Sequence, residues 1–259
     1  YTWNTRGLRE IKMKIAICFS GIARGNVGRN VKSVEASMPD ADFYYATWKE
    51  HENDISKRYK AVTYPEPVLH YNSWTECVED NPHHKYAQYK FGISNKIGGV
   101  YSTGSLNHST KQILAHAYQV RDIKENYDLI VRIRWDTVCG SRINFQKYLD
   151  MSYNENIAVG FAIRGGRHTN LNMFKDIPHE YCTIDTDVSV SRDWCWWLND
   201  NLIIHPPSKF DPEKVFKLHE EKRLWPAEYG WYQVLSENDD HHSVYGGAAI
   251  ERFVRGKDL

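Results

Sequence analysis

The stretch YDLIVRIRWD, residues 127–136, predicts the strand around which the rest of the fold is organised. Side chains of an extended strand alternate between two faces. One face takes an apolar set: Leu129, Val131, Ile133 and Trp135. The other face takes Ile130 together with three charged residues: Arg132, Arg134 and Asp136. The apolar residues indicate a central strand, where an uncompensated charge is expensive to bury.

The three charged residues of this strand have two interpretations. If their face approaches the carboxyl edge of the sheet, Arg132 and Arg134 can meet a ligand phosphate. Asp136 at the strand end can then bind a divalent cation, Mn²⁺ or Mg²⁺. The alternative is an internal arginine–aspartate ion-pair cluster or a solvated edge strand, since structural ion pairs also arise in this way.

Two further strands and a helix are predicted before this one. Residues 14–20 (KIAICFS) form a short apolar run that enters the loop SGIARGN at 20–26, and a helix is expected over 27–36. In open α/β sheets a glycine loop after a strand is a usual ligand site, so its backbone N–H groups and Arg24 are candidate phosphate contacts. A plain strand–helix turn is the alternative. Residues 42–48 (DFYYATW) predict a second strand, and its last residue, Trp48, belongs to the core or stacks on a base or sugar.

The helix before the central strand is expected to begin near Ser109, because Gln112 three residues later completes a capping box. It is expected to end near residues 125–126, and residues 157–163 predict a further strand. Pro226 can open another helix, which would bury Trp231. Strands and helices at these spacings predict an α/β sandwich with a mostly parallel sheet.

Three other acids are candidate catalytic residues. Asp185 and Asp187 lie two apart and can share a metal ion or divide base and metal roles in an extended segment. A solvated or capping pair is the alternative. Glu228 lines a site or only favours the start of the helix that follows Pro226.

Composition limits the class of protein. The 259 residues carry 33 Lys and Arg against 33 Asp and Glu, and this balance argues against coating of duplex DNA or an anionic membrane by bulk charge. No apolar run approaches the roughly 20 residues that a membrane helix needs. The five scattered cysteines favour a reducing compartment. We expect residues 1–12 to be an upstream extension or an expression remnant, and residues 13–259 to form a single domain.

Several of these segments together resemble a family of small viral and microbial glycosyltransferases of the GT-A type. The blocks that carry the resemblance are KIAICFSGIAR, DFYYATW and YDLIVRIRWD. The family's pattern is a first strand ending in Ser-Gly and an arginine, a second strand ending in Trp, and a Tyr-Asp…Arg-x-Arg-x-Asp strand. The matches fall in blocks between residues 13 and 235, and the block at 127–136 is the strongest.

The resemblance implies a GT-A-like, Rossmann-related α/β/α sandwich that binds a nucleoside-diphosphate sugar. Asp136 would take the place of the metal-binding acid of an Asp-x-Asp motif, but Arg134 stands where the first acid of that motif is usual. The donor would lie against Ser20, Gly21, Arg24, Trp48, Arg132 and Arg134. Asp185 or Asp187 would line the acceptor side, with Glu228 nearby.

The resemblance therefore implies a cytoplasmic glycosyltransferase, in the host cytoplasm if the protein is viral. Its acceptor would be a glycan, a lipid-linked sugar or modified phage DNA, and the neutral overall charge speaks mildly against DNA. A non-catalytic nucleotide- or sugar-binding protein on the same scaffold is the alternative, favoured by the missing second acid. A Rossmann-type methyltransferase would need an acid closing the second strand, which instead ends in Thr47 and Trp48.

Overall fold

The computed structural model describes residues 13–68, 103–139, 145–161, 182–185, 190–193, 202–224, 227–235, 241–244 and 250–252. The strands are β1 (Ile15–Phe19), β2 (Asp42–Trp48), β3 (Val62–Tyr64), β4 (Leu129–Ile133), β5 (Thr137–Cys139), β6 (Ala158–Phe161), β7 (Cys182–Asp185), β8 (Val190–Asp193), β9 (Leu202–His205), β10 (His241–Val244) and β11 (Ile250–Arg252). The α-helices are α1 (Val27–Ser37), α4 (Thr103–Ile123), α5 (Phe145–Glu155), α6 (Pro212–Glu220) and α7 (Ala227–Leu235). Residues 1–12, and with them the predicted extension, lie outside the described residues.

The main sheet is mixed and has the strand order β3-β2-β1-β4-β9-β6-β10-β8-β7. The run from β3 to β4 is parallel throughout. Strand β9 is antiparallel to both of its neighbours, and β8 is antiparallel to β10 and β7. All other strands of this sheet point the same way, which confirms the predicted mostly parallel sheet. Strands β5 and β11 form a separate antiparallel pair.

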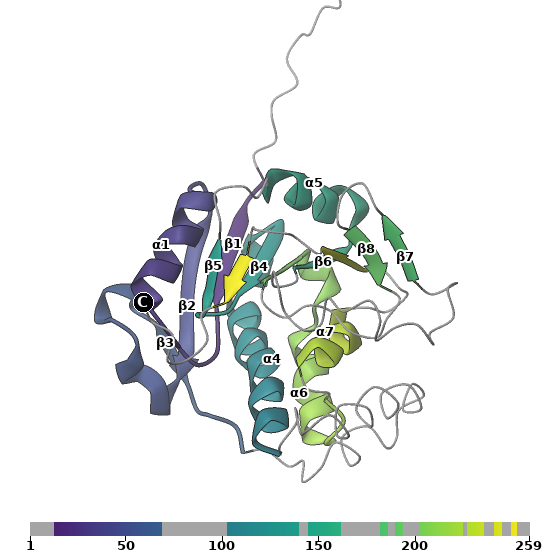
Figure 1. The fold of residues 1–259 in the computed structure, drawn as a ribbon. Helices are drawn as coiled ribbons and strands as arrows, with labels where there is room; N and C mark the ends of the chain where they lie inside the picture. The colour runs from purple at the N-terminus through teal and green to yellow at the C-terminus, as the bar shows by residue number, and fades with distance from the viewer. Residues whose placement is uncertain are drawn as a thin grey trace, which may run out of the picture.

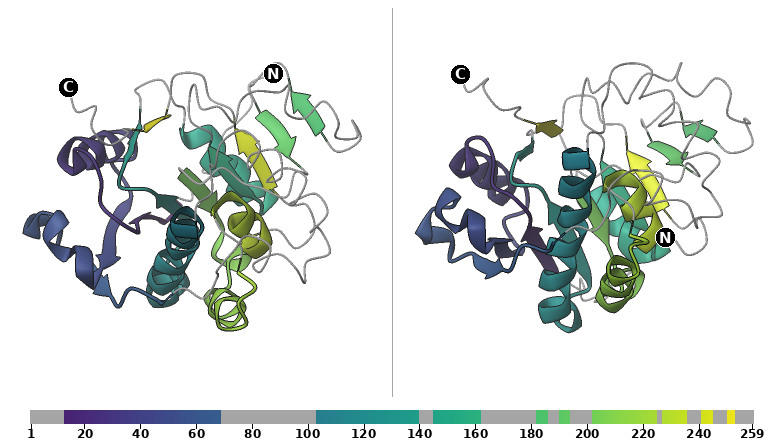
Figure 2. Two further views of the ribbon diagram at one scale, coloured as in Figure 1. Left: turned by 60° about the horizontal axis from the view of Figure 1, so that its bottom comes forward. Right: turned by 90° about the horizontal axis from the view of Figure 1, so that it is seen from below.

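Helices cover both faces of the sheet (Figure 1). Helices α1 and α5 supply Val31, Val34, Phe145 and Leu149 to the core on one face. Helices α4, α6 and α7 supply residues such as Ile113, Val215 and Trp231 to the core on the other face. Figure 2 shows α1 apart from the group formed by α4, α6 and α7. This arrangement confirms the predicted α/β/α sandwich.

The central strand keeps the predicted alternation but is shorter than predicted. Its Leu129, Val131 and Ile133 lie in the core under α1 and α5, and Ile130 lies in the core under α4. The strand ends at Ile133, because the chain turns and the backbone N–H of Thr137 donates to the carbonyl of Arg134 at 3.1 Å. The predicted strand over residues 134–136 is therefore a turn.

The predicted strands and helices around the central strand are largely confirmed. Strands β1, β2 and β6 and helices α1 and α7 lie where the sequence places them. Helix α4 begins at Thr103 rather than near Ser109, and the Gln112 side chain bonds Arg132 instead of capping the helix. Helices α5 and α6 and strand β9 were not predicted. No helix in the described part of the chain has the length and apolar character to cross a membrane.

Candidate functional site

Strands β1, β2 and β4 end side by side. Strand β1 pairs in parallel with both of the others, so their carboxyl ends meet at one edge of the sheet. The backbone N–H of Ser20, just beyond β1, donates to the carbonyl of Ile133 at 3.3 Å. The loop after β1 and the turn after β4 therefore start next to each other, as the predicted site requires.

The loop after β1 has a conformation that needs glycine. Gly21 has a φ of +96°, in the left-handed region. A Cβ atom there would lie 3.9 Å from the Cγ of Gln112, so backbone conformation, not lack of space, requires the glycine. The Ser20 hydroxyl is buried and has no hydrogen-bond partner among the described residues. Asn26 caps α1 by accepting from a backbone N–H of its first turn, and Arg24 between them is partly buried.

Arg132 lies on the buried face of β4 that α4 and α7 cover. Its side chain is fully buried, and one guanidinium N–H donates to the Oε1 of Gln112 at 2.6 Å. The guanidinium also lies over the indole of Trp231 on α7, 5.2 Å from the ring centroid. An aromatic face and an amide oxygen both stabilise a buried cation. Gln112 therefore bonds this arginine from α4, and its Cγ lies next to the space that a side chain at Gly21 would occupy.

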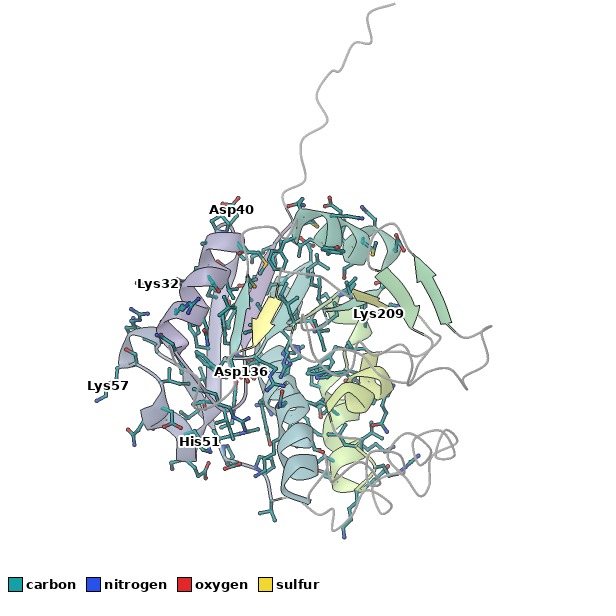
Figure 3. All side chains as sticks on the ribbon, in the orientation of Figure 1. Lys32, Asp40, His51, Lys57, Asp136 and Lys209 are labelled. Carbon is teal, nitrogen blue, oxygen red and sulfur yellow. The ribbon has the colours of Figure 1, made fainter. Side chains whose placement is uncertain are left out.

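Arg134 and Asp136 form a two-pronged ion pair in the turn after β4. The Nε of Arg134 donates to one carboxylate oxygen of Asp136 at 2.8 Å, and its Nη2 donates to the other at 3.0 Å. Both side chains are almost fully buried. Asp136 lies in the middle of the molecule, whereas Asp40 and Lys57 project at its periphery (Figure 3). Of the three charged residues of the predicted strand, Arg134 and Asp136 are thus paired, while Arg132 contacts Gln112 and Trp231.

The turn that carries this pair is fixed by its neighbours on both sides. The indole N–H of Trp135 donates to the carbonyl of Ala46 on β2 at 3.1 Å. The carbonyl of Trp135 accepts from the side-chain amide of Asn30 on α1 at 2.7 Å. The Trp135 ring is itself buried against Phe19 of β1, with ring centroids 5.2 Å apart. A β-strand, a helix and an aromatic core therefore fix the position of the ion pair.

Two buried histidines lie on the same side of the sheet as Arg132. The Nε2 atoms of His116 on α4 and His205 on β9 are 2.9 Å apart. The Nδ1 of His205 lies 3.0 Å from the carbonyl of Pro206, which can only accept, so this nitrogen carries the proton. His205 then accepts from the Nε2–H of His116, whose buried Nδ1 has no hydrogen-bond partner among the described residues.

Burial keeps both of these histidines neutral. Desolvation lowers the pKa of His205 from 6.5 to about 4. Desolvation also lowers the pKa of His116 well below its usual value, and the neighbouring His205 and Arg132 add to that shift. The pair therefore contributes hydrogen bonding without charge beside the buried guanidinium.

The predicted cation at Asp136 does not fit the side chains around it. Both carboxylate oxygens of Asp136 accept from Arg134, so a cation at about 2.1 Å from either oxygen would lie beside a buried guanidinium. The described residues also contain no group of three or more histidine, cysteine, aspartate or glutamate side chains able to hold a metal ion. The arginine–aspartate ion pair, which the sequence left open as an alternative, is the arrangement found.

The remaining predicted site residues lie in varied positions. Trp48 is fully buried and meets Tyr118 of α4 edge to face, so a base or sugar would reach its ring only if neighbouring side chains moved. Asp185 ends β7, the outermost strand of the sheet, five strand positions from β4 and so roughly 24 Å across the sheet. The structure does not bring Asp185 beside the ion pair. Asp187 lies outside the described residues. Glu228 lies in the first turn of α7, three residues before Trp231.

The sequence interpretation missed a polar stripe on α4. Gln112, His116 and Gln119 are buried, and their spacing of four and three residues places them on one face of the helix. Gln112 bonds Arg132, His116 meets His205, and the amide of Gln119 donates to the carbonyl of Phe19 at 3.1 Å. The signal was present in the sequence, because these polar residues recur at helical spacing within the segment predicted as a helix.

Comparison with known proteins gives structural likenesses only. No protein-family model matches this chain, and no curated protein does. Among solved structures it is similar to a galactosyltransferase, LgtC, in complex with donor and acceptor sugar analogues, at 11% identity and a TM-score of 0.41 over 91% of this chain and 73% of that one. It is similar to a mannose-1-phosphate geranyltransferase from Thermus thermophilus, at 11% identity and a TM-score of 0.43 over 90% of this chain and 74% of that one. It is also similar to the mannosyltransferase Ktr4p from S. cerevisiae, at 8% identity and a TM-score of 0.40 over 86% of this chain and 65% of that one. Function therefore has to be inferred from this chain's own residues.

Proposed function

We propose that this protein is a glycosyltransferase with a GT-A-like fold, which moves a sugar from a nucleoside-diphosphate sugar to an acceptor hydroxyl. One observation carries the proposal. The three sequence blocks that resemble such enzymes occupy β1, β2 and β4, which are adjacent and parallel, and they end at one sheet edge. At that edge lie the glycine loop and the buried group formed by Arg132, Arg134 and Asp136. This is the edge at which open α/β sheets usually bind ligands.

The donor diphosphate is proposed to lie between the loop and the turn. Backbone N–H groups around Ser20 and Gly21, with Arg24, would bind phosphate oxygens, and the Arg134 guanidinium would face them from the turn. Breaking the bond from sugar to diphosphate develops negative charge on the leaving group. A guanidinium already fixed in place stabilises that charge as it forms, without reorganisation. Arg132, buried two residues earlier on the same strand, would add positive potential.

The acceptor side is proposed to use the remaining acids. An inverting transfer needs a carboxylate that takes the proton of the acceptor hydroxyl. Asp187 and Glu228 stay predictions for this role, whereas Asp185 lies on the edge strand β7, away from the proposed diphosphate site. Glu228 is supported by its place on α7, the helix whose Trp231 covers Arg132. A glycan, a lipid-linked sugar or modified phage DNA stays the proposed acceptor, and a cytoplasmic location stays a prediction.

A second candidate function is binding without catalysis. The same scaffold can hold a nucleotide or sugar as a non-catalytic protein. This candidate is favoured by Arg134, which stands where a second acid is usual, and by its bonds to both oxygens of Asp136.

Donor turnover separates the two candidates. We would incubate the chain with UDP-, GDP-, CDP- and TDP-sugars and measure release of the nucleoside diphosphate, with and without sugar acceptors. The proposal expects release from one donor type, lost in Arg134→Ala and kept in Arg223→Ala, whose arginine is half-exposed and lies 3.4 Å from Glu221. Binding of a nucleotide with no release from any donor would support the non-catalytic candidate.

A further inference from the structure

We infer, on the basis of the proposed function, that the Arg134 guanidinium takes the charge-compensating place of a divalent cation, so that the donor diphosphate binds without metal. In this inference Arg134 contacts the phosphates, and Asp136 is a positioning residue that holds the guanidinium. The inference rests on the disagreement between the cation expected at Asp136 and the side chains found there.

Both oxygens of the Asp136 carboxylate already accept hydrogen bonds from Arg134. The two N–H···O distances of 2.8 and 3.0 Å span both oxygens of Asp136, as in a fork-to-fork arginine–carboxylate pair. Arg134 is 7% exposed and Asp136 is 2% exposed. A divalent cation bound here would have to displace the guanidinium or lie next to it in a desolvated site, where repulsion between like charges is strong.

The charge balance also suits an anionic ligand. Arg132, Arg134 and Asp136 together carry one net positive charge, since they comprise two guanidiniums and one carboxylate. With a divalent cation on Asp136, the same three side chains and the cation would together carry three net positive charges in a desolvated site. The guanidinium differs in presenting directed N–H groups, which suit the spread oxygens of a diphosphate better than a point charge does.

The turn is rigid enough for such a role. Trp135, between the two paired residues, bonds Ala46 through its indole and Asn30 through its carbonyl. The backbone N–H of Thr137 closes the turn on the carbonyl of Arg134. The guanidinium is therefore held before a ligand arrives, and the binding free energy need not be used to order it.

Calorimetry on the intact chain tests the inference. Binding of UDP, GDP, CDP and TDP would be measured in EDTA and again in excess Mn²⁺. The inference expects one nucleotide to bind in both buffers, with dissociation constants within about fivefold of each other. Tightening by Mn²⁺ beyond that factor would overturn the inference and leave the proposed function standing. Absence of binding in both buffers would overturn the proposed function, and the inference with it.

Two variants and a matched control sharpen this test, with thermal unfolding as the check that each one folds. Arg134→Lys keeps the charge but loses the fork, so we expect binding in EDTA to weaken about tenfold. Arg223→Lys makes the same change at a half-exposed ion pair and should bind as the wild type does. Asp136→Asn should weaken binding by the same factor in EDTA and in Mn²⁺, because its effect runs through Arg134. Unchanged binding by Arg134→Lys, or loss in Asp136→Asn of a Mn²⁺ effect seen in the wild type, would contradict the inference.

Discussion

The two faces of β4 are equally buried but chemically unlike. The face under α1 and α5 carries Leu129, Val131 and Ile133, and every one of these is fully buried and apolar. The face under α4 and α7 carries Ile130 and then Arg132, which lies among amide, imidazole and indole groups. Burial of the first face stabilises the fold, whereas burial of the second is offset in part by the free energy needed to desolvate a charge. Burial alone therefore does not distinguish the apolar face from the face that carries Arg132, and charge does.

The largest expected effect comes from breaking the apolar face at Trp135. Trp135→Ala removes a fully buried indole and its hydrogen bond to Ala46, so the free energy of unfolding should fall by about 4 kcal/mol. Urea unfolding followed by fluorescence and circular dichroism measures the change. Tyr153→Ala, at an exposed site on α5, is the control and should stay within about 0.5 kcal/mol of the wild type. A loss below about 1 kcal/mol at Trp135 would show that the indole does not anchor the turn.

The second prediction asks whether the ion pair between Arg134 and Asp136 stabilises the fold or serves nucleotide binding. Asp136→Ala leaves a buried guanidinium without its carboxylate, and we expect a loss of about 3 kcal/mol in urea unfolding. The double variant Arg134→Met, Asp136→Leu replaces the pair by apolar groups and should recover most of that loss. Its nucleotide binding should nevertheless be abolished. A double variant that is as unstable as Asp136→Ala would mean that the pair stabilises the fold itself.

Much of the architecture could be read from the sequence, because apolar periodicity is a local signal. The runs that became β1 and β2 are short, apolar and bounded by turn residues, and they lie where predicted. Helices α5 and α6 were not predicted, because their few buried residues, such as Phe145 and Val215, lie in segments that are rich in polar residues.

The site was only partly predictable, because its contacts are distant in sequence. Alternation placed Arg132 on a face, but its amide partner Gln112 comes from α4 and its indole partner Trp231 from α7. The turn at Arg134 and Asp136 depends on Ala46 and Asn30, which no local pattern connects to it. The strand pattern therefore predicted which charged side chains are buried. It gave the pairing of Arg134 with Asp136 only as an alternative to ligand binding.

The third prediction concerns the pH dependence of stability on the polar face. His205 and His116 are neutral in the folded protein because burial lowers the pKa of each, to about 4 for His205. The unfolded chain binds more protons than the folded chain between pH 6.5 and 4, so stability is full above that window and falls as the pH falls through it. The expected slope is roughly 1 kcal/mol per pH unit for each histidine.

Urea unfolding at a series of pH values measures this slope. His205→Gln removes one titrating group and should flatten the slope, whatever its effect on stability at neutral pH. The control Tyr153→Ala, at an exposed site on α5, should leave the slope of the wild type. An equal slope in His205→Gln and the wild type would show that the imidazole pair does not remain neutral on the polar face.

The smallest expected effect compares packing density on the two faces within one strand. Ile203 and Ile204 are neighbours on β9, both fully buried, and they enter the cores of opposite faces. Replacing either by valine removes one methylene group, and we expect each change to lower the free energy of unfolding by about 1 kcal/mol. Close packing around Arg132 and the histidines would make the two losses equal, because the cost of a cavity depends on how little the surroundings relax. A clearly smaller loss for Ile203→Val would mean that the polar face is looser, and that its side chains are free to rearrange around a ligand.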